Sequence, residues 1–386
     1  MRQVYLDYAA TTPVKEEVLA EMLPFFSLQY GNPSSLHKFG YTAREAVDLA
    51  RERVAALIGA KASEIYFTSG GTESDNWAVE GVAGAQPAGR AHVITSKIEH
   101  HALLHSCAAL EEKGHSVSYL EVDPTGFVQP HALKQAINER TCLVSIMFAN
   151  NEVGSIQPIA ELAKIANSAG IIFHTDAVQA AGNLPINVQQ LGIDMLSLSA
   201  HKIYGPKGIG ALYIKEGTAI SNFIHGGSQE HKRRAGTENV PGIVGFGKAA
   251  ELAARNLNDH IKKTTTLRDY FIDRLLADIP DVQINGSREQ RLPGNVNATF
   301  NYIEGEALLL DLDINGIAAS TGSACSSGSF APSHVLTAMG LPIEQVYSSL
   351  RFSLGDFTTK EDIDHTVSVL NATVKRLRAF SPFTQE

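Results

Sequence analysis

Short runs of hydrophobic, often β-branched residues alternate along the chain with longer segments whose apolar positions recur about every three to four residues. The first pattern is typical of buried strands and the second of amphipathic helices. The predicted strands are Ile65–Phe67, His92–Thr95, Ser116–Leu120, Leu143–Met147, Ile171–Thr175, Met195–Ser199 and Ala211–Ile214. Helices are predicted between them at Glu73–Val82, Ala102–Lys113, Pro130–Asn138 and Ile159–Ala169. This alternation predicts an α/β fold with a mostly parallel central sheet flanked by helices.

A long helical period, Gly242–Leu276, separates these elements from a second set. The later segment contains predicted strands at Val296–Phe300 and Ser349–Leu354, and predicted helices at Glu304–Leu312 and Lys360–Phe380. A chain of 386 residues also exceeds the size at which one hydrophobic core usually stops growing. We therefore predict a large domain over 15–255 and a smaller α+β domain over 256–386, which the N-terminal segment 1–14 joins.

The amino-acid composition argues against several classes of binding partner and cellular location. The chain has 32 Lys and Arg against 41 Asp and Glu, a formal net charge of −9, which argues against binding to nucleic acid or to an anionic membrane. No apolar run approaches the ~18 residues that span a bilayer. Three cysteines do not make a disulfide framework, and the opening residues "MRQVYLDY" lack the apolar core of a signal peptide. A cytoplasmic protein is expected.

Several short motif matches fail on closer reading. "GIVGFGKA" follows no strand and has Ala249 where a phosphate-binding loop needs Ser or Thr, so it is read as a small-residue face of a helix. "DLDING" opens like a calcium loop, but Gly322 stands where the bidentate Glu belongs, so a helix end and a turn are expected. In "EHHALLH", His101 and His105 share a helical face without a partner cluster, and no metal site is predicted.

Three other segments place polar groups directly after predicted strands, where the ligands of open α/β sheets gather. In "TSGGTESDN", Gly71 and Thr72 begin a helix and offer backbone N–H groups and a hydroxyl to a phosphate. "FHTDAVQ" ends a buried strand with Asp176, and "SLSAHKIYGPKG" ends the next strand shortly before Lys202. Each segment alone has an ordinary reading, as a helix entry, a capping acid or a surface lysine.

Together, the three segments supply what pyridoxal 5'-phosphate requires. The cofactor needs a phosphate cup, a carboxylate that keeps its pyridine nitrogen protonated and an amine that bonds its aldehyde. A protonated ring withdraws electrons from an amino acid's α-carbon, and Lys202 is the natural base for the α-proton. The order of phosphate loop, Asp176 and Lys202 is far more specific than any one of them.

The same residues lie within motifs that resemble those of the NifS/IscS-type cysteine desulfurases, a group of the class V aminotransferase family. The resemblance runs from "YLDYAATTP" at Tyr5–Pro13 to "RFSLGDFTT" at Arg351–Thr359 and so covers nearly the whole chain. It implies the fold type I of pyridoxal-phosphate enzymes, a homodimer, and removal of sulfur from L-cysteine to give L-alanine and an enzyme persulfide.

The resemblance also implies a role for each matching residue. Lys202 in "SAHK" would hold the cofactor, and Asp176 in "TDAVQ" would pair with its pyridine nitrogen. His100 in "IEHH" would stack on the ring and assist proton transfer, and Arg351 would clamp the substrate carboxylate. The remaining implied contacts are Gly71, Thr72, Ser199 and His201 at the phosphate, Gln179 at the phenolic oxygen, Asn151 beside cofactor and substrate, and Thr237 from the other subunit.

Cys325 lies in "STGSACSSGS", a run of Gly and Ser in which a hydrophobic core cannot form. By the resemblance, it is the nucleophile that takes sulfur from the substrate and passes it to an acceptor protein, such as an iron–sulfur scaffold. A thiol that visits two places needs a mobile carrier, which Gly and Ser favour. Cys107 and Cys142, in apolar periods, are expected to be structural.

Alternative functions remain open at this stage. A selenocysteine lyase or another class V pyridoxal-phosphate enzyme would use the same cofactor residues, and a non-catalytic sulfur carrier would need only Cys325. The physiological acceptor is also open. Housekeeping relatives carry a longer C-terminal tail that docks the scaffold, whereas this sequence stops at "SPFTQE", which disfavours a scaffold of that kind.

Overall fold

The largest sheet of the computed structural model, which describes residues 2–86, 91–321 and 332–380, has seven strands in the order β2-β8-β7-β6-β5-β3-β4. These strands are β2 (Ile65–Thr68), β3 (His92–Ser96), β4 (Ser116–Leu120), β5 (Thr141–Ser145), β6 (Ile172–Asp176), β7 (Met195–Ser199) and β8 (Gly210–Ile214). Only β8 runs antiparallel to its neighbours in this sheet. The carboxyl ends of the other strands therefore meet at one edge.

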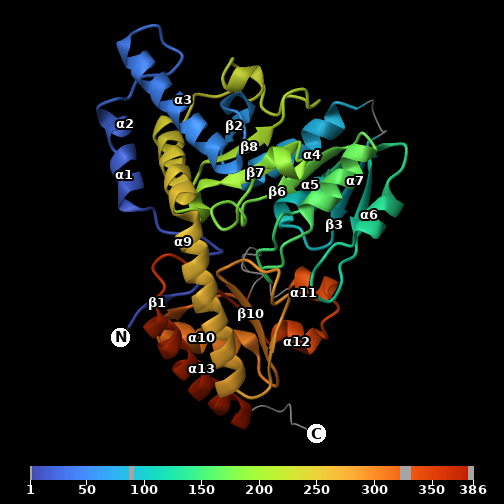
Figure 1. Ribbon diagram of the computed structural model, residues 1–386, viewed down its shortest axis with the longest axis vertical. Coiled ribbons are helices and arrows are strands. Elements are labelled where there is room, and N and C mark those ends of the chain that lie inside the picture. Colours follow the sequence, from blue (N-terminus) through green and yellow to red (C-terminus); the bar gives the residue numbers. More distant parts are fainter. Residues whose placement is uncertain (1, 87–90, 322–331, 381–386) are drawn as a thin grey trace.

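Helices cover both faces of this sheet, which is why its strands read as nearly continuous apolar runs. On one face, α4 (Gly71–Gly84) and α5 (His101–Glu112) bury residues such as Trp77 and Leu103 against alternate strand residues. The other face is covered by α3 (Lys38–Ile58), α7 (Ile159–Ser168) and the first half of α9 (Val240–Asp278). Figure 1 shows this sandwich in the upper part of the molecule. The predicted parallel α/β sheet is confirmed.

The strand and helix predictions of this region are confirmed with small shifts at the ends. One shift of two residues is in β5, which ends at Ser145 rather than at the predicted Met147. The reason is a side chain: the Met147 N–H donates to the carboxylate of Glu99, at 3.0 Å, instead of continuing the strand ladder. Asp176 is the last residue of β6 rather than the first after it.

The helix α9 connects the two parts of the molecule (Figure 1). Its first half contributes Phe246 to the core beside the large sheet, and its second half contributes Phe271 to another core. "GIVGFGKA" lies in its first turns, as predicted: a Cβ on Gly247 would lie 2.5 Å from the Cα of Ala50 in α3, so a small residue is required there. The domain boundary at 255/256 stays a prediction, and α9 runs through it without a break.

A second, antiparallel sheet has the order β12-β10-β9 within the described chain. Its strands are β9 (Val282–Ile284), β10 (Asn295–Phe300) and β12 (Ser349–Ser353). The helices α10 (Gly305–Ile314) and α13 (Lys360–Phe380) pack with α9 around its core. As predicted for "DLDING", α10 ends there and Gly316 turns the chain with φ +80°.

The N-terminal segment belongs to this second core. The strand β1 (Val4–Tyr5) pairs in parallel with β11 (Ile317–Ala318), and Val4 and Leu6 are buried in the core. The remaining elements are α1 (Glu16–Met22), α2 (Pro24–Ser27), α6 (Pro130–Ala136), α8 (Val188–Leu191), α11 (His334–Ala338), α12 (Ile343–Tyr347) and the 3₁₀ turns η1 (Ala62–Glu64), η2 (Ala200–Lys202) and η3 (Glu230–Lys232). Among the described helices, none has the length and apolar content needed to cross a membrane.

Candidate active site

The sequence-predicted site residues gather in one cavity at the carboxyl edge of the large sheet. This cavity has a volume of about 280 Å³. Its walls are formed by Ala9, Ala10, Gly71, Thr72, Asp75, His100, Met147, Asn151, Asp176, Val178, Gln179, Ser199, His201, Lys202 and Arg351. Of the residues predicted from the sequence, Thr237 is outside these walls, and Cys325 lies outside the described residues.

One end of the cavity is built to hold an anion. Gly71 and Thr72 are the first two residues of the 14-residue helix α4, so their N–H groups and the helix dipole point outward there. Ser199 and His201 face them from the end of β7, and an adjoining hollow adds Lys207. These donors and the nearby cation suit a phosphate group.

Glycine is needed at this end because the backbone segments approach closely. A Cβ on Gly71 would lie 2.7 Å from Cγ2 of Val178, and one on Gly210 would lie 2.7 Å from the Cα of Gly70. Gly210 is in β8, the strand beside the one that leads into the loop. The glycine pair therefore brings the anion-binding loop down onto the sheet edge.

A buried carboxylate also lines the cavity. Asp176 is 7% exposed, and its Oδ1 accepts a hydrogen bond of 2.9 Å from the Val178 N–H. Burial raises the pKa of Asp176 to about 6, while the Val178 hydrogen bond and the charge of Lys202 limit the increase. The group is therefore an anion at neutral pH, and it can stabilise a protonated heterocyclic nitrogen.

Lys202 is the last residue of η2, just beyond the end of β7. Its Nζ donates to the carbonyl oxygens of Ala9 and Ala10, at 2.6 and 2.7 Å. Gln179 Nε2 donates to the same Ala9 oxygen at 3.0 Å. The N-terminal segment therefore positions the amine that the sequence analysis assigned to the cofactor.

His100 precedes α5 and caps it, because its Nδ1 accepts a hydrogen bond of 3.1 Å from the Ala102 N–H. Burial, followed by the charge of Lys202 and the neighbouring histidines, lowers the pKa of His100 to about 4. The imidazole is neutral at pH 7 in this environment. A neutral ring is suited to stacking against an aromatic cofactor and to exchanging a proton.

Arg351 reaches the cavity from the second sheet, where it lies in β12. Its Nη2 pairs with Asp7 Oδ1 at 2.8 Å, and its Nη1 donates to the Asn151 carbonyl at 3.1 Å. Its Nε is buried and has no hydrogen-bond partner in the described chain. A guanidinium held on two sides, with a third donor unused, fits an incoming carboxylate.

The described residues on either side of the segment that contains Cys325 are hydrogen-bonded close to this cavity. Ser320 forms two backbone hydrogen bonds with Arg351, at 3.0 and 2.6 Å. On the other side, Ser333 Oγ donates to the buried carboxylate of Glu152 at 2.5 Å, next to Asn151. Cys325 is five residues from Ser320, which is at most roughly 18 Å of chain.

Thr237 is exposed and lines a separate hollow together with Ser69 and Gly208, beside the anion end. The other two cysteines are not among the cavity walls and pack in the core between the sheet and α4 and α5. Burial raises the pKa of Cys107 to about 12, which suits a structural thiol rather than a nucleophile.

His101 and His105 stack their rings with centroids 5.1 Å apart on α5. Within 2–86, 91–321 and 332–380, no group of three or more His, Cys, Asp or Glu side chains is arranged to hold a metal ion.

Sequence reasoning missed several residues of the site. Asp7, Asp75 and Lys207 line or adjoin the cavity, and the Ala9 carbonyl contacts Lys202, yet no pattern singled them out. Asp7 and Ala9 lie in "YLDYAATTP", which was used only as a family motif. The sequence feature that could have indicated Asp7 is a charged residue next to the short apolar run "VYL".

Comparison with known proteins agrees with this geometry. The family model described as aminotransferase class-V matches residues 4–366. The chain is 56% identical to the cysteine desulfurase IscS of Dictyoglomus turgidum, over 100% of this chain and 98% of that protein. A solved NifS-like protein superposes with a TM-score of 0.92 at 38% identity, covering 97% of this chain and 100% of the other. A structure of SspA in complex with cysteine gives 0.83 at 37% identity, covering 92% and 100%.

Proposed function

The chain belongs to the class V aminotransferase family, within which it groups with cysteine desulfurases, and we propose that it is itself a pyridoxal-phosphate-dependent cysteine desulfurase. The reaction takes the sulfur of L-cysteine onto the thiol of Cys325, which releases L-alanine and leaves a persulfide on the protein. The observation that carries this proposal is the convergence of Asp176, Lys202 and Arg351 in one cavity beside the two fixed ends of the Cys325 segment.

The described cavity fits pyridoxal 5'-phosphate. Gly71, Thr72, Ser199 and His201 would hold the phosphate, and Asp176 would hold the pyridine nitrogen. The unused Nε of Arg351 is an orphaned donor that suits the carboxylate of the substrate. When bound, the cofactor withdraws electrons from the α-carbon of an amino acid, which makes its α-proton acidic.

The protein's own groups then divide the remaining work. Arg351 orients the substrate by its carboxylate, and Lys202 accepts the α-proton at its Nζ. His100 is neutral and so can carry a proton to or from the groups around the cofactor. The Cys325 thiolate attacks the substrate's sulfur, so that an S–S bond forms as the C–S bond breaks and its electron pair stays with the β-carbon. A proton then completes the methyl group, and Lys202 returns a proton to the α-carbon to give alanine.

We propose that the enzyme acts as a homodimer. A group of large apolar side chains is exposed over α1, α2 and the start of α3: Leu19, Leu23, Phe26, Leu28, Tyr30, Leu36, Phe39 and Tyr41. Such a large exposed apolar patch marks an interaction site. Thr237 would complete the phosphate site of the other subunit, which accounts for its position outside the cavity of its own chain.

Delivery of the persulfide sulfur to an acceptor protein, such as an iron–sulfur scaffold in the cytoplasm, completes the proposed role. The described cysteines, Cys107 and Cys142, are free thiols, which is usual for cytoplasmic proteins.

The test is an assay of purified holoenzyme with L-cysteine and a thiol reductant. Equal amounts of alanine and sulfide are expected. Transamination products without sulfide would instead indicate another class V reaction, and activity confined to selenocysteine would indicate a lyase for that substrate. A preparation that binds no pyridoxal phosphate when the cofactor is added would leave only the role of a sulfur carrier.

The substitution Asp176→Asn tests the carboxylate at the pyridine end. The amide can still hydrogen-bond but cannot stabilise a protonated ring, so turnover should fall by about two decades, equivalent to about 3 kcal/mol of transition-state stabilisation. Cofactor affinity, measured by fluorescence titration, should change much less than kcat. Turnover near the parent level would show that another group protonates the ring.

The substitution Arg351→Lys tests the carboxylate clamp. Lysine retains the charge but not the planar fork, so the KM for cysteine should rise by roughly tenfold or more while the bound cofactor per chain stays constant. Steady-state kinetics and the cofactor absorbance report the two quantities separately. Loss of cofactor instead of substrate affinity would assign Arg351 to the fold or to the cofactor site.

A further inference from the structure

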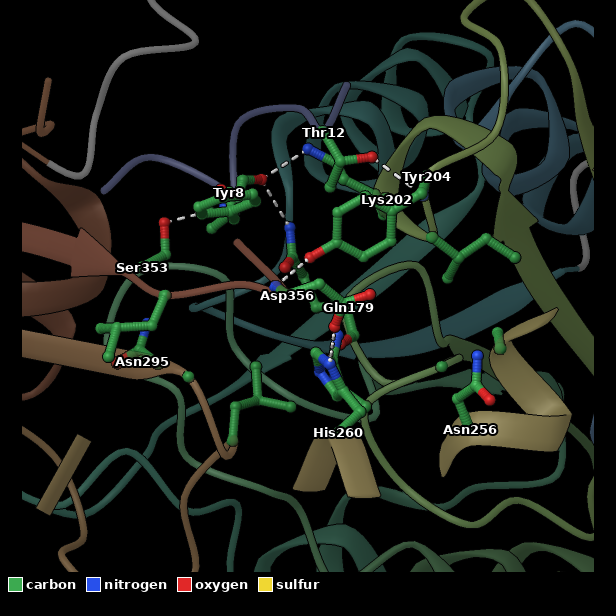
Figure 2. Close-up of a pocket in the computed structure, with 18 of the residues that line it drawn as sticks. Tyr8, Thr12, Gln179, Lys202, Tyr204, Asn256, His260, Asn295, Ser353 and Asp356 are labelled. Atoms are coloured by element: carbon green, nitrogen blue, oxygen red, sulfur yellow. Dashed lines mark hydrogen bonds and ion pairs between the residues drawn. The ribbon is translucent and has the colours of Figure 1, made fainter. Parts of the chain in front are cut away.

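A second cavity lies behind Lys202 and shares Ala9, Gln179 and Lys202 with the active-site cavity (Figure 2). Its open volume of about 60 Å³ suits a few water molecules rather than another organic ligand. Its walls come from both parts of the molecule: Asn295 and Ser353 of the second sheet face Gln179 and Lys202, which follow strands of the first sheet (Figure 2). This region is therefore where the two parts of the active site are fixed relative to each other.

Asp356 makes the densest set of contacts in this region. Its Oδ2 pairs with Lys15 Nζ at 2.5 Å, and its Oδ1 pairs with His260 Nδ1 at 2.6 Å. Its backbone N–H donates to the Tyr204 hydroxyl at 2.6 Å, and its carbonyl oxygen accepts a hydrogen bond from Lys263 Nζ. Figure 2 shows Asp356, Tyr204 and His260 close together.

The partners of Asp356 lead back to the catalytic amine. His260 Nε2 is hydrogen-bonded to Asn183 Oδ1 at 2.8 Å, and Asn183 Nδ2 donates to the Gln179 carbonyl at 3.0 Å. Gln179 in turn donates to the Ala9 carbonyl that accepts from Lys202. His260, Asn183 and Gln179 therefore connect Asp356 to the Ala9 carbonyl that Lys202 contacts, and within Gln179 the connection passes from its backbone carbonyl to its side chain.

The chain itself joins Asp356 to Arg351. Asp356 follows β12 by three residues, and Arg351 is the central residue of that strand. Gly355 fits between Tyr8 and Tyr204, because a Cβ there would lie 2.4 Å from a Tyr8 ring carbon and 2.5 Å from the Tyr204 hydroxyl. Displacement of Asp356 would therefore displace the end of the strand that carries the substrate clamp.

Asp356 is ionised at neutral pH, which supports its ion pairs with Lys15 and His260. Burial alone would raise its pKa, but hydrogen bonds from His260 and Lys15 outweigh this and lower the pKa to about 2. Lys15 also lies 4.5 Å from the centre of the Tyr204 ring, so its charge is shared between the carboxylate and an aromatic face.

We propose that Asp356 is a positioning residue that sets the distance between the carboxylate clamp Arg351 and the amine of Lys202. The proposal rests on the function proposed above, since it assigns Arg351 to the substrate and Lys202 to the cofactor. Arg351 lies in β12 and Lys202 in the turn after β7, and Asp356 links the end of β12 by ion pairs to Lys15 before α1 and His260 on α9, and by a backbone hydrogen bond to Tyr204 just after Lys202.

The substitution Asp356→Asn keeps the size of the side chain and removes its charge. The KM for cysteine should rise about tenfold, because small displacements of a positioning group are costly, while kcat falls less than about threefold. Cofactor content should be unchanged. Hydrogen–deuterium exchange without substrate should increase over β12 and not over β2, a readout independent of turnover.

The matched control is Asp364→Asn. The Asp364 carboxylate contacts Arg274 Nη1 at 2.6 Å and the Tyr270 hydroxyl at 2.5 Å. The control substitution therefore also weakens contacts with a cation and a hydroxyl. Both of those partners lie on α9 beside the second sheet alone, so its KM should remain at the parent value. Equal KM changes in the two variants would show that Asp356→Asn acts by general destabilisation of the protein and not by positioning Arg351.

Lys15 supplies a second pair of variants should Asp356→Asn fold poorly. Lys15→Met should reproduce the rise in KM. Lys15→Arg should keep KM near the parent value, because arginine can still pair with the carboxylate. An active parent with unchanged KM in Asp356→Asn and Lys15→Met would overturn the positioning role. A parent inactive on cysteine would instead overturn the proposed function, so the two failures are distinguishable.

Discussion

Replacing Lys202 with alanine is expected to abolish turnover, with a loss of at least about 10³-fold, or about 4 kcal/mol of transition-state stabilisation. Two functions disappear together, because the same Nζ is assigned to bonding the cofactor and to accepting the α-proton. The backbone should tolerate the change. Lys202 is only partly buried, and its Nζ donates to the carbonyl oxygens of Ala9 and Ala10.

Borohydride reduction followed by peptide mapping checks this assignment. In the parent protein, the reduced cofactor should be found on the peptide that contains Lys202, and in Lys202→Ala no lysine should carry it. Lys215→Ala is the control, because Lys215 lies at the surface and pairs with Asp194. Label on Lys207, the other lysine next to the phosphate end, would assign the Schiff-base amine to that residue instead.

The sequence predicted the part of the site that follows from strand order. Gly71, Asp176 and Lys202 each lie at the carboxyl end of a strand of the large sheet or within three residues of it, and parallel strands bring these ends to one edge. Their convergence could therefore be predicted without coordinates. Hydrophobic periodicity was sufficient for this region because its strands are buried on both faces and its helices on one.

The contribution of the second sheet could not be predicted in the same way. Arg351 reaches the cavity only because β12 lies beside the N-terminal segment, where Asp7 bridges to Ser353 and β1 pairs with β11. These contacts join residues more than 300 positions apart, and no local pattern encodes them. The family resemblance, rather than the residue pattern, identified Arg351.

Local patterns were also available that the sequence analysis left unused. The helix α3 buries Ala43, Val47, Ala50 and Val54, a spacing that predicts an amphipathic helix. His37 also caps this helix, because its side chain accepts from the Gly40 N–H. Asp75 could not have been found in this way, because its environment is set by the fold. Burial, followed by the charge of Asp176, raises the pKa of Asp75 well above its usual value.

The substitution Cys325→Ala should separate the two halves of the reaction. In the proposed assignment, Lys202, Asp176 and Arg351 would bind cofactor and substrate without a protein thiol, so the variant should still bind cysteine and change the cofactor's absorbance. Cleavage of the C–S bond needs an acceptor for the sulfur, so alanine formation should fall about a hundredfold or more. No persulfide should form.

The described cysteines provide the internal control for this experiment. Cys142 is half-buried and its thiol contacts the His92 carbonyl at 3.5 Å, and burial raises its pKa as it does that of Cys107. A neutral, buried thiol is a poor nucleophile, so Cys107→Ala and Cys142→Ala should each retain desulfuration. Mass spectrometry after a single turnover should then find the added sulfur on the Cys325 peptide alone. Alanine formation at the parent rate in Cys325→Ala, or added sulfur on Cys107 or Cys142, would show that the substrate's sulfur leaves by another route.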